Sequence, residues 1–495
     1  MDFSTLLVCA SCLWVLFQAL QMARKKSSTA KLPPGPVPLP VVGSLFKIGD
    51  KPNESLAELA KTYGPLMTLR LGLVTTIVAS SSAMAKEILQ KQDHLLAGRT
   101  VVDSVRTLDY NDSAMAPSQP NQHWRRLRAV CNTQIFTTQK LDSYQGLRRL
   151  KVQDLLAHMR EKSQMGEPVE IVEAVFVTTL NLISNTVFSV DLVGLNTESA
   201  QRFNRLIWGM MEEAGRPNLT DYFPILRPID PQGARRRMTA YFKQLLALFD
   251  EMIDDRLSSS GSPKKNDFLD ALLEQTQGGG LTRHHVKCLL VYVFSAGSET
   301  SASTVEWAMV ELLRHPKVME KARSELAETI KEGRPVEESD ISRLPYLQAV
   351  LKETFRLHPP APLLLPHRAE SDVEIGGFTI PKDAKVLVNV WAIGRDPDTW
   401  VDPTSFMPER FLGSNMDYKG RDFELLPFGA GRRICPGLPL AYRMVHLMLA
   451  SLLRSFAWKL PDGMAPQDID MSHKFGITLR KQVPLLAVPI VPLEC

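Results

Sequence analysis

Residues 427–437 read PFGAGRRICPG and place one cysteine, Cys435, inside a glycine-rich loop. Gly429, Gly431 and Gly437 permit positive φ angles and a close approach of the backbone to the sulfur. The apolar stretch that follows, 438–453, has the composition of a helix, so Cys435 is expected at a helix N-terminus. The helix dipole there favours negative charge and lowers the pKa of a thiol. The loop therefore predicts a cysteine that is held as a thiolate.

Two further residues of the loop fit the same interpretation. Phe428 can cover one side of the sulfur, and Arg433 can neutralise a negative group close to it. The alternative is a structural cysteine buried in a turn, which is the usual role of a lone cysteine. The pattern F-x-x-G-x-R-x-C-x-G fixes five positions, Cys435 among them. A pattern fixed at so many positions rarely occurs by chance, which favours a functional thiolate.

Residues 283–315 form a long apolar stretch that ends before Pro316, and its centre, 288–296, is apolar nearly all round. This composition predicts a helix that is buried on every side. Midway along it lies the sequence AGSET, in which Glu299 precedes Thr300. A buried acid is costly unless it serves a purpose, so both residues are candidates for proton transfer. The alternative is a Ser/Thr/Gly patch that packs against a neighbouring helix.

Other motifs place charged side chains at helical spacing. Glu353 and Arg356 are three residues apart and can pair on one helix face. Trp124 and Arg128 are four residues apart on another predicted helix. An exposed helix pair and an ordinary core tryptophan are the simpler alternatives for these two motifs.

These motifs resemble those of cytochrome P450 enzymes. They occur in the same order as in that family, and together they span nearly the whole chain. The resemblance implies a mainly α fold with a small β subdomain, and haem b bound with Cys435 as the axial ligand of the iron. It also implies that Glu299 and Thr300 are the catalytic pair in oxygen activation, and that Arg410 joins Glu353 and Arg356 in a charged triad that supports the cysteine loop. The residues that the resemblance assigns to cofactor binding, beside Cys435, are Trp124, Arg128, His367, Arg433 and Phe428.

Within the family, the segments 221–228 and 392–397 and the proline-rich stretch 31–40 resemble plant microsomal members. The subfamily that contains geraniol 8-hydroxylase and ferruginol synthase is the most similar, so the expected substrate is a mono- or diterpenoid. Alkaloids and phenolics are alternative substrates. By resemblance, the substrate pocket is lined by residues 100–116, 209–218, 291–296, 361–365 and 475–478.

The N-terminal segment predicts a membrane anchor, 1–23, because 3–20 carries no charge and is long enough to cross a bilayer. Basic residues follow, which predicts a single-pass protein in the endoplasmic reticulum membrane with its catalytic domain in the cytosol. A cleaved signal peptide is the alternative. Residues 24–40 form a basic, proline-rich linker, and residues 41–495 are expected to be one catalytic domain.

The composition restricts the remaining functions. The chain has 495 residues, a net charge of +4 and six scattered cysteines, which favours a reduced compartment and argues against nucleic acid as a partner. The expected partner is NADPH–cytochrome P450 reductase, an acidic flavoprotein that would dock on basic residues. The candidates for this contact are Arg125, Arg126, Arg432 and the group Arg148, Arg149 and Lys151. A haem isomerase or dehydratase and a non-catalytic haem-binding protein are the alternatives to a monooxygenase.

Hydrophobic periodicity predicts the main elements of the body. A β-hairpin is expected over 66–80, with its turn at Gly72. Helices are expected over 122–131, 146–162, 238–257 and 346–357, and strands over 375–380 and 384–390.

Overall fold

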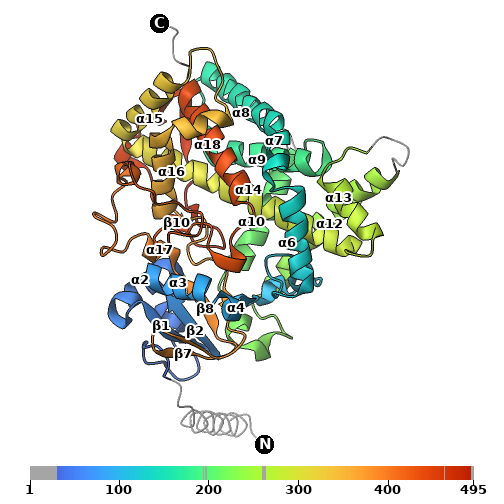
Figure 1. The fold of residues 1–495 in the computed structure, drawn as a ribbon, viewed down its shortest axis with the longest axis vertical. Helices are drawn as coiled ribbons and strands as arrows, with labels where there is room; N and C mark the ends of the chain where they lie inside the picture. Colours follow the sequence, from blue (N-terminus) through green and yellow to red (C-terminus); the bar gives the residue numbers. More distant parts are fainter. Residues whose placement is uncertain (1–30, 193, 195–197, 259–263, 462, 492–495) are drawn as a thin grey trace, which may run out of the picture.

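The computed structural model describes residues 31–192, 194, 198–258, 264–461 and 463–491, and these are mostly helical (Figure 1). The helices of ten or more residues are α2 (Pro52–Tyr63), α6 (Gln122–Gln134), α8 (Gln145–Met165), α9 (Ile171–Phe188), α10 (Glu198–Gly215), α12 (Ala234–Ser258), α13 (Phe268–Gln277), α14 (Arg283–Arg314), α15 (Pro316–Thr329), α16 (Pro345–Leu357) and α18 (Leu438–Ser455). The predicted helices are all present, each within a few residues of its expected bounds.

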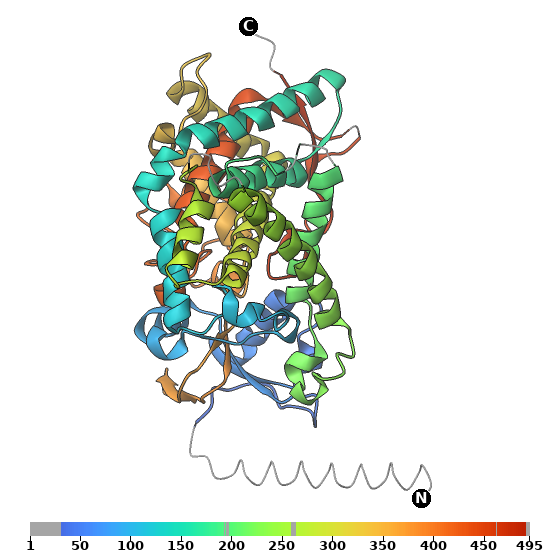
Figure 2. The same cartoon turned by 90° about the vertical axis from the view of Figure 1, so that its right-hand side faces the viewer.

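The main sheet has five strands in the order β1-β2-β8-β5-β3 and lies at one end of the molecule (Figures 1 and 2). Its strands are β1 (Leu66–Leu71), β2 (Val74–Ala79), β8 (Lys385–Val388), β5 (His367–Arg368) and β3 (Gly98–Arg99). The predicted hairpin is confirmed, because β1 and β2 pair antiparallel around a turn at Gly72, where φ is +58°. β8 then pairs parallel to β2 and places Lys385 beside Thr76.

Smaller sheets complete the β structure. β12 (Leu486–Ile490) pairs with β4 (Val169–Glu170) and β9 (Ala457–Lys459), and β10 (His473–Lys474) pairs with β11 (Arg480–Lys481). The prediction of one strand over 375–380 was wrong. This segment ends β6 (Val373–Ile375), turns at Gly376 and Gly377 with positive φ, and continues as β7 (Phe378–Ile380).

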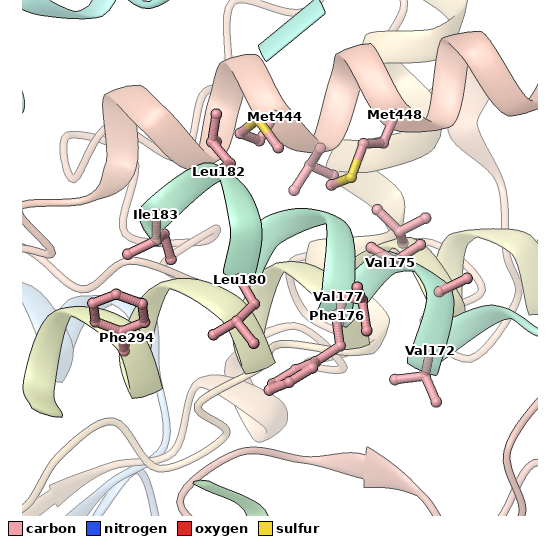
Figure 3. Packing of buried hydrophobic residues seen from close by; sticks show 14 of the residues in the cluster. Val172, Val175, Phe176, Val177, Leu180, Leu182, Ile183, Phe294, Met444 and Met448 are labelled. Carbon is pink, nitrogen blue, oxygen red and sulfur yellow. The ribbon is translucent and has the colours of Figure 1, made fainter. Parts of the chain in front are cut away.

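The core is built around α14, which packs against α9 on one side and α18 on another. Figure 3 shows α9 between these two helices, with Leu180 and Ile183 near Phe294 of α14 and Leu182 near Met444 of α18. Within the described ranges, α9 is the one helix apolar and long enough to span a membrane, but 89% of it is buried. It is therefore a core helix. The predicted N-terminal anchor lies outside the described residues.

The bounds of α14 follow from its sequence. The hydroxyl of Thr282 accepts a hydrogen bond of 3.2 Å from the backbone N–H of His285 and caps the helix. Pro316 starts the next helix, α15, because proline is tolerated at the first position of a helix but not in its interior. The 32 residues of α14 carry the AGSET motif through the centre of the molecule.

Candidate functional site

Cys435 lies in the loop before α18, whose N-cap is Gly437, as the sequence predicted. The backbone N–H groups of Gly437 and Leu438 donate hydrogen bonds to its sulfur, and Arg128 adds positive charge. Burial nevertheless outweighs these three effects and raises the pKa of the Cys435 thiol. The helix N-terminus therefore lowers this pKa as expected, but desolvation of the thiolate has the larger effect, so the net shift is upward.

Two of the three loop glycines have the predicted backbone conformation. Gly429 and Gly431 have φ values of +67° and +64°, and a Cβ atom on Gly431 would lie 1.9 Å from the carbonyl oxygen of Leu89. Gly431 therefore permits the close packing of the loop on the preceding segment. Gly437 has an ordinary φ of −79°, so the freedom of glycine to adopt a positive φ is not used there.

Phe428 connects the loop to the helices behind it. The carbonyl oxygen of Phe428 accepts a 2.9 Å hydrogen bond from the backbone N–H of Cys435. Its ring packs edge-on against Phe355 of α16, with ring centroids 5.3 Å apart, and lies 5.5 Å from Tyr418. Phe428 and Cys435 both line the cavity described next, so the ring lies on the same wall as the sulfur.

A cavity of about 430 Å³ lies in front of Cys435. All five segments predicted to line a substrate pocket contribute to it, and most of the lining side chains are apolar. Examples are Val105, Met210, Tyr292, Leu363 and Phe475. The size and apolar lining suit an organic molecule with few polar groups.

Trp124, Arg128 and Arg433 meet at one wall of this cavity. The guanidinium of Arg433 lies 4.4 Å from the centre of the Trp124 ring, and that of Arg128 lies 5.8 Å from it. Arg128 donates to the carbonyl oxygen of Ile434 at 2.7 Å, and Arg433 donates to the carbonyl oxygens of Ala97 and Ser118. The structure therefore brings together residues that lie about 300 positions apart in the sequence.

Arg99 completes this cluster and was missed by sequence reasoning. It lies in the short strand β3, and no local pattern distinguishes it from any other arginine. It is buried, lines the cavity and donates to the carbonyl oxygen of Leu365 at 2.7 Å, while its Nε has no partner.

The three arginines create a site for an anion. Burial, together with the nearby positive charges, lowers the pKa of Arg99 to about 9 and that of Arg433 to about 10, and burial lowers the pKa of Arg128. Within the described residues, none of them forms an ion pair with a carboxylate of the chain. Buried charges require a partner, so the unpaired cluster fits a bound group with carboxylates, such as the propionates of haem.

His367 is also buried against the cavity, in β5. Its Nδ1 lies 2.6 Å from the carbonyl oxygen of Leu96, which fixes the ring. Burial, reinforced by the charge of Arg99 and less so of Arg433, lowers the pKa of His367 to about 3. The imidazole is therefore neutral at neutral pH. Its one N–H, on Nδ1, is donated to Leu96, so Nε2 can only accept a hydrogen bond and the ring carries no counter-charge.

Glu299 and Thr300 face different surroundings. Thr300 lines the cavity and donates a 2.7 Å hydrogen bond to the carbonyl oxygen of Ala296. Glu299 lies behind the cavity wall, where Arg480 Nε is 3.3 Å from its Oε1. Burial raises the pKa of Glu299 to about 7, although Arg480 and the hydroxyl of Thr478 oppose the shift. Thr478 itself lines the cavity, so it lies between Glu299 and the interior.

The predicted charged triad is present and buried. Glu353 accepts hydrogen bonds from Arg356 at 2.6 and 2.7 Å and from Arg410 at 3.0 Å. Arg356 also donates to three backbone carbonyl oxygens, those of Gly394, Pro403 and Ser405. The triad therefore ties α16 to the segment before the cysteine loop, and it does not line the cavity.

Of the basic residues predicted to dock a partner, two are not available. Arg148 and Lys151 are buried, where Arg148 pairs with Glu338 and Lys151 pairs with Asp154 and Asp191. They face inward because these positions of α8 lie on the side that packs on the core. The other four are exposed: Arg125, Arg126, Arg149 and Arg432.

Comparison with known proteins shows which family the chain is similar to. The sequence profile of the family described as Cytochrome P450 matches residues 33–486. The chain is 50% identical to the geraniol 8-hydroxylase of Swertia mussotii over 493 residues and 50% identical to that of Catharanthus roseus over 492 residues, and each alignment covers 99% of both chains. It is 46% identical to the drimenol monooxygenase of Persicaria hydropiper over 493 residues, which is 99% of this chain and 97% of that enzyme.

Proposed function

This chain belongs to the cytochrome P450 family and is a monooxygenase, and we propose that it hydroxylates a mono- or diterpenoid with O₂ and electrons from an NADPH-dependent reductase. The observation that carries this proposal is the apolar cavity, which has Cys435 on one wall and an unpaired arginine cluster on another. The names of the relatives support the substrate class, because geraniol 8-hydroxylase and drimenol monooxygenase act on terpenoids.

We propose that haem b lies between Cys435 and the arginine cluster. Cys435 would hold the iron through its sulfur. Arg99, Arg128 and Arg433 would hold the propionates, with Trp124 donating a hydrogen bond and His367 lying beside them. Bound haem supplies the oxygen-activating chemistry, since a thiolate ligand favours cleavage of the O–O bond. The chain contributes the amide groups of Gly437 and Leu438, which stabilise negative charge on the sulfur.

The proposed role of Glu299 and Thr300 is proton supply. A pKa of about 7 means that Glu299 exists in both protonation states near neutral pH, as a group that takes up and releases protons must. Thr478 lies between the Glu299 carboxyl and the cavity, and the Thr300 hydroxyl lines the cavity itself. We infer that protons pass from the Glu299 carboxyl to this wall of the cavity.

The proposed location is the endoplasmic reticulum membrane, with the catalytic domain on the cytosolic side. Large apolar side chains are exposed near the start of the described chain and in the loop after α11 (Leu219–Tyr222), with Val37 87%, Phe46 80% and Ile225 82% exposed. The two segments are neighbours, because the backbone N–H of Leu73, beside this N-terminal region, bonds to the carbonyl oxygen of Tyr222. Exposed apolar patches of this kind suit contact with lipid.

The test of the cofactor assignment is the carbon-monoxide difference spectrum of the reduced full-length protein. We expect the absorbance peak characteristic of thiolate ligation, and we expect Cys435→His to lose it while retaining its fold. Cys131→Ser is the matched control, because Cys131 is buried in α6 and does not line the cavity. A Cys435→His variant that keeps the peak would contradict the ligand assignment.

The reaction is tested with the reductase, NADPH and a panel of terpenoids. Hydroxylated product that requires NADPH is the expected result. Conversion that proceeds without NADPH would indicate an isomerase or dehydratase, and the absence of any conversion by a haem-loaded protein would indicate a binding role.

A further inference from the structure

The cavity extends away from Cys435 to the main sheet. Its lining there comes from β1, β2 and β8, with α2 and the segment around α11 opposite, and includes Leu56, Leu71, Tyr222 and Leu387. We call this part the sheet lobe. In Figure 1 the strands of the sheet lie below α18, the helix that follows Cys435. The sheet lobe is thus lined by different elements from the loop and helix that hold the sulfur.

Two polar side chains face the sheet lobe without a partner among the residues that the structure describes. Thr76 of β2 and Lys385 of β8 are register neighbours in the parallel pair, so they project from the same face of the sheet. The Thr76 side chain is 0% exposed, and its hydroxyl has no hydrogen-bond partner. In the described part of the chain, the ammonium of Lys385 forms neither an ion pair nor a hydrogen bond. Both residues line the cavity.

A carboxylate lies across from this pair. Asp221 also lines the cavity, and one of its oxygens accepts a 2.5 Å hydrogen bond from the backbone N–H of Asp103. Asp221 and Lys385 form no contact within 4.0 Å, yet each charge influences the pKa of the other. Burial raises the pKa of Asp221 to about 6 and lowers that of Lys385. Both side chains line the cavity without contacting each other, so the space between them belongs to the cavity and is open to a bound group.

The chemistry of the gap selects the group that fits. A buried hydroxyl or ammonium without a partner is costly, so a ligand that satisfies these groups gains affinity. A hydroxyl group can accept a hydrogen bond from Lys385 and donate one to Asp221 at the same time. A carboxylate would be repelled by Asp221, an amine would be repelled by Lys385, and an ether could only accept.

We propose that Lys385, Thr76 and Asp221 bind a hydroxyl group of the substrate, so that the substrate is an alcohol whose apolar skeleton extends along the cavity toward Cys435. This inference rests on the proposed function and adds the polar group that orients the substrate. It makes the three residues determinants of specificity, because they bind the end of the molecule that is not oxidised.

The experiment measures binding by the spin-state shift of the haem-loaded full-length protein, with geraniol, its methyl ether and its carboxylic acid as probes. We expect geraniol to bind about tenfold more tightly than the ether, as one hydrogen bond to a charged group allows. Lys385→Met should reduce this ratio to about one and change the dissociation constant of the ether less than twofold. Asp221→Asn, which keeps an acceptor for Asp103, and Thr76→Val should each reduce the ratio several-fold.

Matched controls separate this effect from general damage. Lys382→Met removes an exposed ammonium three residues away, and Thr75→Val removes a hydroxyl on the opposite face of β2. Both should leave the ratio unchanged. Equal binding of alcohol and ether by the unmodified protein, tighter binding of the acid, or an unchanged ratio in both Lys385→Met and Thr76→Val would overturn the inference.

Failure of the proposed function gives a different result. It would appear as a missing thiolate peak or as the absence of NADPH-dependent product from every probe. Failure of the sheet-lobe inference alone would leave the peak and the turnover intact and would remove only the preference for the alcohol.

Discussion

Glu299 and Thr300 are adjacent in the sequence, but successive residues of a helix project about 100° apart. Thr300 therefore reaches the cavity, while Glu299 lies beside Arg480, whose guanidinium packs 4.8 Å from the centre of the Trp208 ring. This separation suits a relay in which the acid is shielded from the substrate. It also sets the pKa of Glu299, because burial there outweighs the nearby positive charge.

At the residue scale, we predict that Glu299→Gln lowers NADPH-driven product formation roughly 100-fold, the low end of the range for general acid catalysis. The group donates a proton only in its protonated form, which is lost as pH rises through about 7. Product formed per NADPH should therefore fall from pH 6 to pH 8 in the unmodified enzyme. The same ratio should not change over this range in Glu299→Gln.

Glu306 provides the control for this prediction. It lies on the same helix, and burial raises its pKa to about 7 as well, but its carboxylate accepts a 2.8 Å hydrogen bond from Leu485 and does not line the cavity. Glu306→Gln should keep the pH dependence of the unmodified enzyme. If it abolishes the dependence too, the assignment of the pKa to Glu299 is wrong.

At the scale of elements, α16 holds the cysteine loop in two ways. Phe355 packs against Phe428 of the loop, and Arg356 bonds to Glu353 and to the backbone of the segment 394–405. Both side chains of the Glu353–Arg356 pair are fully buried. A buried pair is tolerated when its remaining hydrogen-bonding positions are satisfied, and here Arg410 and the backbone carbonyl oxygens satisfy them.

We predict that Arg356→Ala lowers the free energy of unfolding by about 3–5 kcal/mol, because it leaves the charge of Glu353 buried with one partner fewer. Urea unfolding followed by tryptophan fluorescence measures the change. Arg343→Ala removes an exposed arginine that pairs with Asp340, and it should cost less than about 1 kcal/mol. Equal midpoints for the two variants would show that the triad does not stabilise the fold.

At the scale of the whole molecule, the surface beside the cysteine loop is positively charged. Arg125 projects from α6 and Arg432 from the loop itself, and the two segments are joined by the hydrogen bond from Arg128 to the carbonyl oxygen of Ile434. Arg432 also pairs with Asp93 at 3.3 Å, which leaves Arg125 as the freer charge. An acidic partner would be attracted to this face by charge.

We predict that Arg125→Glu combined with Arg432→Glu slows electron transfer from the reductase about tenfold at low salt, because it reverses the charge that steers association. The rate of haem reduction at several reductase concentrations measures the effect, and the difference should shrink at 0.5 M salt. Lys61→Glu, an exposed charge reversal on α2, is the control and should have no effect. Substrate binding should be the same in all three proteins, and a loss that persists at high salt would argue against docking at this face.

Much of the fold could be predicted from the sequence, because the signals are local. The bounds of α14 and α16, the β1–β2 hairpin and the position of Cys435 before α18 follow from caps, prolines, glycines and periodicity. The hairpin of β6 and β7 was missed because its two glycines were read as part of one strand. The burial of Arg148 and Lys151 was missed because an ionic partner far along the chain cannot be seen in a helical pattern.

The sequence by itself determined the family, the glycine-rich cysteine loop and the segments that line the cavity, since each depends on residues only a few positions apart. Only the tertiary structure decided that Arg99 joins Arg128 and Arg433, that Glu299 lies beside Arg480, and that Lys385, Thr76 and Asp221 line one cavity. The physical reason is that these contacts join segments far apart in the chain. Their distances and their burial exist only once the sheet and the helices have packed together.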